Sequence, residues 1–430
     1  MSRSSFRYIA ALGAAALLFS CSAPALAHPD RWGPAREVED GANVAGSDDQ
    51  PAMTSTEPAS PKAPQQSTAP VNIDSPSAVL MEARSGRVLF SKNANERRNP
   101  ASVTKIMTLI VAFDAIRDGK VKMDDKVTIS DEAHSQVGTI IFADTGETFS
   151  LAELLKSVAV GSANDAAVAV GEHVSGSVDA FVEAMNAKAK SLGMMDTQFR
   201  NPTGLSADGH LTSAYDIALM SRYAALNYPE LIKLTSIYGD DLQVPWRKNG
   251  PTFRLWNNNK LLTWYPGADG LKTGWTEAAG YCLAATAVKN EVRMISVIMG
   301  ADTWKRRNAE AAKLLDYGFS NYTAVELAPL GKPVAIVSVS RGKLPKLAVV
   351  PQALFAVSVA KGEQKKVQTE VRLPKRVEAP IQQGQAIGEI IATLDGKEIG
   401  KMTLVASAAV PKATFWDTLV NTTKKILFLQ

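Results

Sequence analysis

The alternation of apolar and polar residues predicts β-strands at both ends of one long segment. Apolar runs at residues 78–81 and 88–90 flank a short turn, which is the pattern of a β-hairpin. Two later runs, at 281–288 and 292–299, are separated by a turn at Lys289-Asn290, which predicts a second hairpin. We therefore expect one sheet that contains strands from both ends of the segment.

Between the two hairpins, apolar residues recur every three to four positions, which predicts amphipathic helices. One helix carries Val103 on its apolar face and ends at Asp118-Gly119. Another begins at Ser150, where Glu153 completes a capping box. Further helices are expected at 165–173, 178–191, 213–227 and 304–317. Residues 73–322 are thus predicted to form one α/β (α+β) domain, with an antiparallel sheet and a helical cluster.

A different pattern begins after this domain. Residues 323–411 hold short strand-like runs and turn signals, which predict a small all-β domain. Its expected strands lie at 333–339, 355–360, 367–373 and 387–394, the last ending at the turn Asp395-Gly396. Residues 412–430 place Trp416 and other apolar residues on one face of a helix and lysines on the other. Such an amphipathic helix can pack on its own domain or lie on a membrane surface, and its terminal position favours the membrane.

The N-terminal residues predict export. Residues 1–27 combine two arginines, an apolar stretch and the small-x-small site Ala25-Leu26-Ala27, which is the layout of a secretory signal peptide. Lipidation of Cys21 is the alternative interpretation of the same region. The apolar stretch is too short for a transmembrane helix. Residues 28–72 are rich in proline, alanine and serine, which predicts a flexible linker.

Composition excludes several classes of partner and cofactor. The chain has 47 basic and 43 acidic residues and no basic run interleaved with aromatic residues, so we expect no nucleic-acid partner. Four histidines and two cysteines are scattered without ligand spacing, so no metal and no other cofactor is expected. If Cys21 leaves with the signal peptide, Cys282 cannot form an internal disulfide, and we expect it to pack as a small core residue.

Ser102 and Lys105 place a hydroxyl and an amine three residues apart at the start of a predicted helix. Both side chains then project from one face, about one turn apart. Ser102 could attack a substrate while Lys105 takes its proton, and the helix N-terminus adds partial positive charge where negative charge would develop. The same Ser-x-x-Lys spacing recurs at 340–343 and 358–361 in the predicted β domain, so the spacing alone is weak evidence.

Two further motifs strengthen the case. Ser162-Ala163-Asn164 lies at a bend between two predicted helices, and Lys272-Thr273-Gly274 precedes a predicted strand. In order, the three motifs match those of active-site-serine penicillin-binding proteins and β-lactamases. The longer runs around them resemble the D-alanyl-D-alanine carboxypeptidases of the low-molecular-mass penicillin-binding group. These runs are 100–108, 162–167, 201–205, 269–274 and 279–281.

The resemblance implies the catalytic roles. Ser102 would be the nucleophile that forms an ester with the penultimate D-alanine, and Lys105 would be its general base. Burial and the nearby charge of Lys272 would keep Lys105 neutral by lowering its pKa. Ser162 and Asn164 would relay the proton to the leaving amine and hold the substrate amide.

The resemblance also implies a binding site for the substrate. Lys272 and Thr273 would bind the terminal carboxylate, and Gly274 would let the substrate backbone lie close to the strand edge. Arg307 would assist with the carboxylate, although Arg306 stands beside it. Some family members carry an arginine before a pair of leucines, whereas this chain has Asn257-Asn258-Asn259-Lys260, so no arginine contact from this loop is implied. His210, a lone histidine in a loop, is expected to be structural.

The expected function is therefore removal of the terminal D-alanine from peptidoglycan peptides, with β-lactam antibiotics acylating the same serine. An endopeptidase that cleaves cross-links and a penicillin-binding scaffold with minor catalysis stay open as alternatives. A β-lactamase is disfavoured by the extra β domain and by Ala163, where class A enzymes have aspartate. We expect an exported protein in the periplasm, peripheral on the outer face of the inner membrane through its C-terminal helix.

Overall fold

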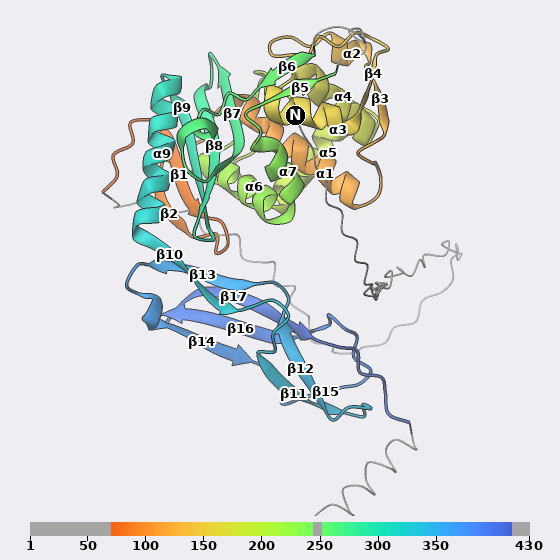
Figure 1. Ribbon diagram of the computed structural model, residues 1–430, viewed down its shortest axis with the longest axis vertical. Helices are drawn as coiled ribbons and strands as arrows, with labels where there is room; N and C mark the ends of the chain where they lie inside the picture. The colour runs from red at the N-terminus through yellow and green to blue at the C-terminus, as the bar shows by residue number, and fades with distance from the viewer. Residues whose placement is uncertain (1–69, 244–251, 415–430) are drawn as a thin grey trace, which may run out of the picture. The chain divides into compact units, whose positions relative to one another are not determined.

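The computed structural model describes residues 70–243 and 252–414, which form a mixed α/β part followed by a β-rich part (Figure 1). The predicted signal peptide, most of the predicted linker and nearly all of the predicted amphipathic helix lie outside these residues. Within the described residues, no helix is long and apolar enough to cross a membrane.

A five-stranded antiparallel sheet forms the centre of the α/β part, with the strand order β2-β1-β9-β8-β7. Its strands are β1 (Ser77–Glu82), β2 (Val88–Lys92), β7 (Ala268–Thr276), β8 (Gly280–Lys289) and β9 (Val292–Ala301). Strand β1 pairs with β9, which confirms that both ends of the segment join one sheet. Strand β7 lies at the edge, so its outer side does not pair with another strand of this sheet.

The turn between β8 and β9 lies one residue later than predicted. Lys289 pairs with Val292, so the two turn residues are Asn290 and Glu291 rather than Lys289 and Asn290. Both turn residues have positive φ, 49° and 63°. A two-residue hairpin turn of this kind needs two left-handed residues, and asparagine adopts that conformation readily. The apolar pattern fixes the strands better than it fixes the residue at which a strand ends.

Both faces of the central sheet are covered, which explains its continuous apolar runs. Successive residues of a strand point to opposite faces. Val79 and Met81 of β1 belong to the core shared with the helical cluster. Ala78 and Leu80 belong to the second core, which includes residues of α9 (Trp304–Asn321).

The helical cluster follows the predicted order. It contains α1 (Lys105–Arg117), α2 (Asp131–His134), α3 (Leu151–Lys156), α4 (Asn164–Ser175), α5 (Val178–Ser191), α6 (Ala214–Asn227) and α7 (Pro229–Thr235), with the short α8 (Leu261–Trp264) after it. The predicted capping box is confirmed, since the Ser150 side chain accepts from the Glu153 amide and the Glu153 carboxylate accepts from the Ser150 amide. Two small two-stranded sheets were not predicted. One pairs β3 (Lys126–Thr128) with β4 (Thr148–Ser150), and the other pairs β5 (Gly239–Leu242) with β6 (Phe253–Trp256).

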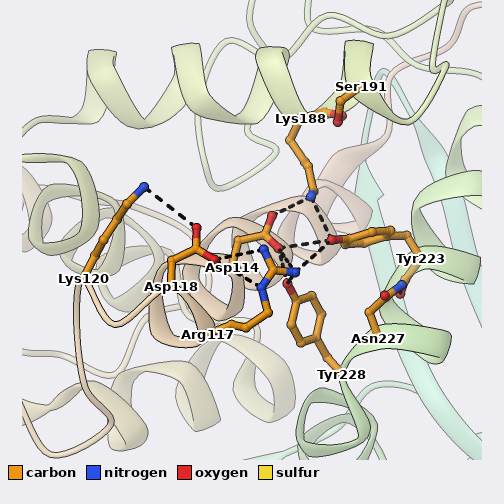
Figure 2. A network of polar contacts seen from close by, with 9 residues as sticks. All are labelled: Asp114, Arg117, Asp118, Lys120, Lys188, Ser191, Tyr223, Asn227 and Tyr228. Atoms are coloured by element: carbon orange, nitrogen blue, oxygen red, sulfur yellow. Dashed lines mark hydrogen bonds and ion pairs between the residues drawn. The ribbon is translucent and has the colours of Figure 1, made fainter. Parts of the chain in front are cut away.

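A polar network ties three elements of the cluster together around Asp114 of α1 (Figure 2). Lys188 of α5 lies 2.7 Å from one Asp114 carboxylate oxygen. The other oxygen accepts hydrogen bonds from the hydroxyls of Tyr223 and Tyr228, at the end of α6. Arg117 donates to Tyr228 over 3.0 Å. This network holds the C-terminal end of α1, the helix whose first residue is Lys105.

The β-rich part has its own core. Its strands are β10 (Tyr322–Ala328), β11 (Ala335–Ser340), β12 (Lys346–Pro351), β13 (Phe355–Ala360), β14 (Val367–Arg372), β15 (Arg376–Glu378), β16 (Ala386–Leu394) and β17 (Lys397–Ala406). They form a pair, β10-β13, and a sheet with the order β14-β16-β17-β12-β11-β15. The four predicted strands correspond to β11, β13, β14 and β16, and the Asp395-Gly396 turn joins β16 to β17 as predicted. The other four strands were not predicted individually: β15 has only three residues and the first half of β17 is largely polar, whereas β10 and β12 are mostly apolar.

Candidate active site

A cavity of about 490 Å³ lies beside the edge strand β7. Five of the predicted site residues line it: Ser102, Ser162, Thr273, Gly274 and Arg307. The other three, Lys105, Asn164 and Lys272, are buried. The three motifs, which lie up to 170 residues apart in the sequence, are therefore brought to one place.

Ser102 lies in a single turn of 3₁₀-helix, Ala101–Thr104, that precedes α1. The prediction of a helix start is confirmed, although the first turn is tighter than an α-helix. Ala101 has a φ of 48°, a left-handed conformation that is uncommon for a residue with a side chain. Within this turn and the first residue of α1, the Ser102 Oγ and the Lys105 Nζ lie 3.0 Å apart.

Lys105 is fully buried and surrounded by oxygen atoms. Besides Ser102, its Nζ donates to Asn164 Oδ1 over 2.7 Å and to the Thr203 carbonyl over 2.6 Å. Burial holds the pKa of Lys105 well below its usual value, and the positive charge of Lys272 lowers it further. The negative charge of Asp165 opposes this shift. Burial and the nearby charge of Lys272 thus lower the pKa of Lys105, as expected from the sequence.

The loop that supplies the Thr203 carbonyl was not predicted to have a role. Asn201 organises this loop, because its Oδ1 accepts from the amides of Thr203 and Gly204 over 3.2 and 2.7 Å. Gly204 has a φ of 81°, and a Cβ atom placed there would lie 2.0 Å from the carbonyl oxygen of Ala101. The loop therefore packs directly beneath the turn that carries Ser102. The signal in the sequence was the Asn-Pro-Thr-Gly run, which favours a tight turn but does not show what the turn contacts.

The second motif lies at an unusual bend in the backbone. The turn of π-helix Ser157–Gly161 ends at Ser162, which has a left-handed φ of 62°, and Asn164 begins α4. This bend places Ser162 at the cavity while Asn164 faces Lys105. The Asn164 Nδ2 donates to the Val137 carbonyl over 2.6 Å, which fixes its Oδ1 toward the lysine.

The third motif was expected from the sequence to lie before a strand, but the motif lies inside strand β7. Lys272, Thr273 and Gly274 pair with residues of β8 on their inner side. A Cβ atom at Gly274 would lie 2.9 Å from both the Ser102 amide nitrogen and the Pro100 carbonyl oxygen. The glycine is therefore required for close packing of the edge strand against the serine turn.

Two buried cations lie together at this end of the site. Lys272 donates to the Thr273 carbonyl over 3.0 Å, and burial together with the charge of Arg307 lowers the pKa of Lys272 to about 7. Arg307, on the first turn of α9, lies 5.9 Å from the ring of Tyr281, and burial lowers its pKa to about 10. Arg306 is exposed and pairs with an aspartate one turn away, so Arg307 is the arginine at the cavity.

Comparison with known proteins identifies the family. Residues 63–303 match the family described as D-alanyl-D-alanine carboxypeptidase, and residues 322–412 match the one described as penicillin-binding protein 5, C-terminal domain. The D-alanyl-D-alanine carboxypeptidase DacF of Bacillus subtilis is 42% identical over 347 residues, which cover 80% of this chain and 88% of that protein. The chain belongs to the D-alanyl-D-alanine carboxypeptidase family.

Solved structures agree with this membership. Penicillin-binding protein 5 from Haemophilus influenzae is 34% identical, with a TM-score of 0.68, and the match covers 80% of this chain and 100% of that one. Penicillin-binding protein D2 from Listeria monocytogenes, solved in an ampicillin-bound form, is 30% identical, with a TM-score of 0.52, and covers 57% of this chain and 98% of that one. The D-alanyl-D-alanine carboxypeptidase family thus accounts for the α+β fold, the C-terminal all-β domain and a serine-type hydrolase activity.

Two residues outside the motifs are structural in this carboxypeptidase. His210 is buried, its Nδ1 accepts from the Arg200 amide over 3.1 Å, and its Nε2 lies 2.9 Å from Thr104 Oγ1. Because Nδ1 is the acceptor, Nε2 carries the proton. Burial lowers the pKa of His210 to about 4, so it is neutral at pH 7. Cys282 is fully buried in the core, as predicted.

Proposed function

We propose that this chain removes the terminal D-alanine from peptidoglycan stem pentapeptides through an acyl-enzyme on Ser102. The observation that carries this proposal is the contact of Ser102 with a buried lysine at the wall of a cavity. The Ser102 Oγ lies 3.0 Å from Lys105 Nζ, and Lys105 has no access to solvent. A nucleophile beside a base with a lowered pKa is the arrangement that activates a serine.

The surroundings of Lys105 suit an uncharged amine. A neutral lysine has two N–H donors and one lone pair. The Asn164 Oδ1 and the Thr203 carbonyl can only accept, so they take the two donors. The lone pair is then left for the third neighbour, the hydroxyl of Ser102, which can donate its proton. Lys105 would therefore act as the general base for acylation.

Ser162 and Asn164 would have different roles. Ser162 lines the cavity, and we propose that it passes the proton on to the leaving amine. Asn164 is buried, with its oxygen toward Lys105 and its nitrogen toward Val137. Asn164 would therefore position Lys105. A direct contact between Asn164 and the substrate amide stays a prediction.

The cation pair would recognise the end of the substrate. Thr273 and Arg307 line the cavity, and Lys272 lies behind them. A terminal carboxylate placed here would be paired with cations and with the Thr273 hydroxyl. The substrate backbone would lie along the outer side of β7, where Gly274 leaves room beside Ser102. This arrangement suits a peptide with a free carboxyl terminus, as in a carboxypeptidase substrate.

The experiment that tests this function compares two substrates. The purified protein is incubated with a peptide that ends in D-Ala-D-Ala and, separately, with cross-linked peptide dimers. We expect free D-alanine from the first peptide, and none when Ser102→Ala replaces the native protein. Cleavage of the dimers alone would replace the carboxypeptidase with an endopeptidase. Absence of cleavage in both, with retained penicillin binding, would support a scaffold role.

The pH dependence of catalysis follows from Lys105 and Lys272. Lys105 must lose its proton to act, so activity rises as pH rises through the pKa of Lys105, which burial lowers. Lys272 must keep its proton to bind a carboxylate, and its pKa is about 7. We therefore expect kcat/KM for D-alanine release to fall as pH rises through about 7. In Lys272→Arg the guanidinium stays charged, and the fall should move to higher pH. Profiles without a fall, or with the same fall in both proteins, would contradict this assignment.

We also propose that the mature protein is exported and lies on the outer face of the cytoplasmic membrane. The support comes from residues 1–27, with the layout of a signal peptide, and from residues 412–430, with one apolar and one basic face. Deletion of Ala413–Gln430 is expected to move the protein from the membrane fraction to the soluble fraction of fractionated cells. Equal partition of the deleted and full-length chains would refute the membrane role.

A further inference from the structure

The cavity beside Ser102 is lined by cations and not by acids. Lys260 and Arg307 line it, and Lys272 is buried next to it. Among the described residues that line the cavity, none is an aspartate or a glutamate. The positive charge at the site therefore favours negatively charged ligands. Lys272 and Arg307 already have proposed roles in binding the substrate carboxylate. Lys260 is the cation at the cavity that has no role so far.

The sequence explains why Lys260 faces the cavity. In the run Asn257-Asn258-Asn259-Lys260, the first and third residues are buried and the second and fourth line the cavity. Asn257 donates to the carbonyls of Thr235 and Ile237 over 3.2 and 3.1 Å. Asn259 donates to the Gly270 carbonyl of β7 over 2.9 Å.

These contacts make the loop a fixed support rather than a flexible rim. Asn257 Oδ1 also accepts from the Asn259 amide over 2.9 Å, so the two buried asparagines hold each other. The Asn258 carbonyl lies 3.4 Å from an Arg307 guanidinium nitrogen, which links the loop to the carboxylate end of the site. The main chain at Lys260 is thus pre-organised relative to Arg307 and to β7.

The Lys260 ammonium has a neutral partner. It donates to the Tyr238 hydroxyl over 2.8 Å and lies 5.0 Å from the centre of the Tyr238 ring. No carboxylate among residues 70–243 and 252–414 lies within 4.0 Å of it. An ammonium has three N–H donors, so two remain for a ligand in the cavity. Tyr238 holds the side chain in place without neutralising its charge.

We propose that Lys260 is a specificity-determining residue that binds the carboxylate of the departing D-alanine from the rim of the cavity. This inference rests on the proposed carboxypeptidase function. A carboxylate has two oxygen atoms and can accept from several donors at once. Arg307 and Thr273 approach it from the wall of the cavity, and Lys260 approaches from the loop. A peptide that ends in an amide, or that continues beyond this position, has no carboxylate here. Lys260 would therefore add little to the binding of such a peptide.

The test uses two peptides that differ in one group, a D-Ala-D-Ala carboxylate and its carboxamide. The shortened peptide is measured by chromatography for the native protein and for Lys260→Met. We expect kcat/KM for the carboxylate to fall roughly tenfold in Lys260→Met, as for loss of one charge-assisted hydrogen bond. The carboxamide should change less than about twofold, because it makes no ionic contact. The preference for a free carboxylate would therefore shrink.

Two further variants separate specificity from structure. Lys305→Met removes the same charge from an exposed residue of α9 that does not line the cavity, and it should leave both rates unchanged. Lys260→Arg keeps the charge and should retain most of the preference. Equal losses on both peptides in Lys260→Met, or no loss on either, would overturn the inference while leaving the carboxypeptidase function intact. Absence of cleavage by the native protein would instead overturn the proposed function.

Discussion

Replacing Lys105 with glutamine is expected to lower the rate of acylation by a β-lactam by about a thousandfold, within the range known for loss of a general base. Glutamine keeps a polar side chain in the buried site but cannot take the proton of Ser102. The two acceptors of Lys105, Asn164 Oδ1 and the Thr203 carbonyl, can still receive amide hydrogen bonds. The effect should therefore fall on catalysis more than on folding.

Stopped-flow measurement of acylation, with thermal melting of the same protein, checks this expectation. A matched control is Lys188→Gln, because Lys188 is a partly buried lysine that is also hydrogen-bonded but lies in the Asp114 network. That variant should melt earlier and acylate at nearly the native rate. An acylation rate of Lys105→Gln within about tenfold of the native value would remove Lys105 as the base.

Replacing Gly204 with alanine is expected to lower acylation by about a hundredfold, since a displacement of about 1 Å can have that effect. The added Cβ would lie 2.0 Å from the Ala101 carbonyl oxygen and 2.9 Å from Thr104 Oγ1. The first of these is backbone and cannot rotate away. The turn that carries Ser102 must therefore move, and the Thr203 carbonyl that holds Lys105 must move with the loop.

Gly146 provides the control for this substitution. Its φ is 84°, nearly that of Gly204, and a Cβ atom there would meet nothing within 4 Å. Gly146→Ala therefore has the conformational cost of about 1 kcal/mol without the clash. We expect Gly146→Ala to melt slightly earlier and to acylate normally. If both variants acylate alike after correction for the folded fraction, the loop at Gly204 does not position the serine.

Much of the candidate active site could be predicted from the order of short motifs. Three motifs, which contain Ser102, Ser162 and Lys272, have residue types that are typical of acyl transfer to a serine. Their order along the chain excluded the chance Ser-x-x-Lys matches in the β domain. The structure brings these motifs together at one cavity. It also places Arg307, which the resemblance had implied, at the cavity and the adjacent Arg306 on the surface, since adjacent positions on a helix differ in direction.

What the sequence could not show are contacts made by backbone groups and by loops. The Thr203 carbonyl that holds Lys105 has no side-chain signature. The need for glycine at position 204 depends on a chain segment about 100 residues away. Lys260 reaches the cavity because two buried asparagines alternate with outward residues, a pattern that polarity alone does not reveal. Each of these depends on the tertiary structure.

We propose that Ser102 forms the covalent intermediate. The most direct test is to incubate the protein with penicillin, measure its intact mass and locate the adduct by peptide mapping. We expect one added penicillin per chain, attached to Ser102, and no adduct in Ser102→Ala. An adduct on Ser162 or any other residue, or an unchanged mass in the native protein, would contradict it.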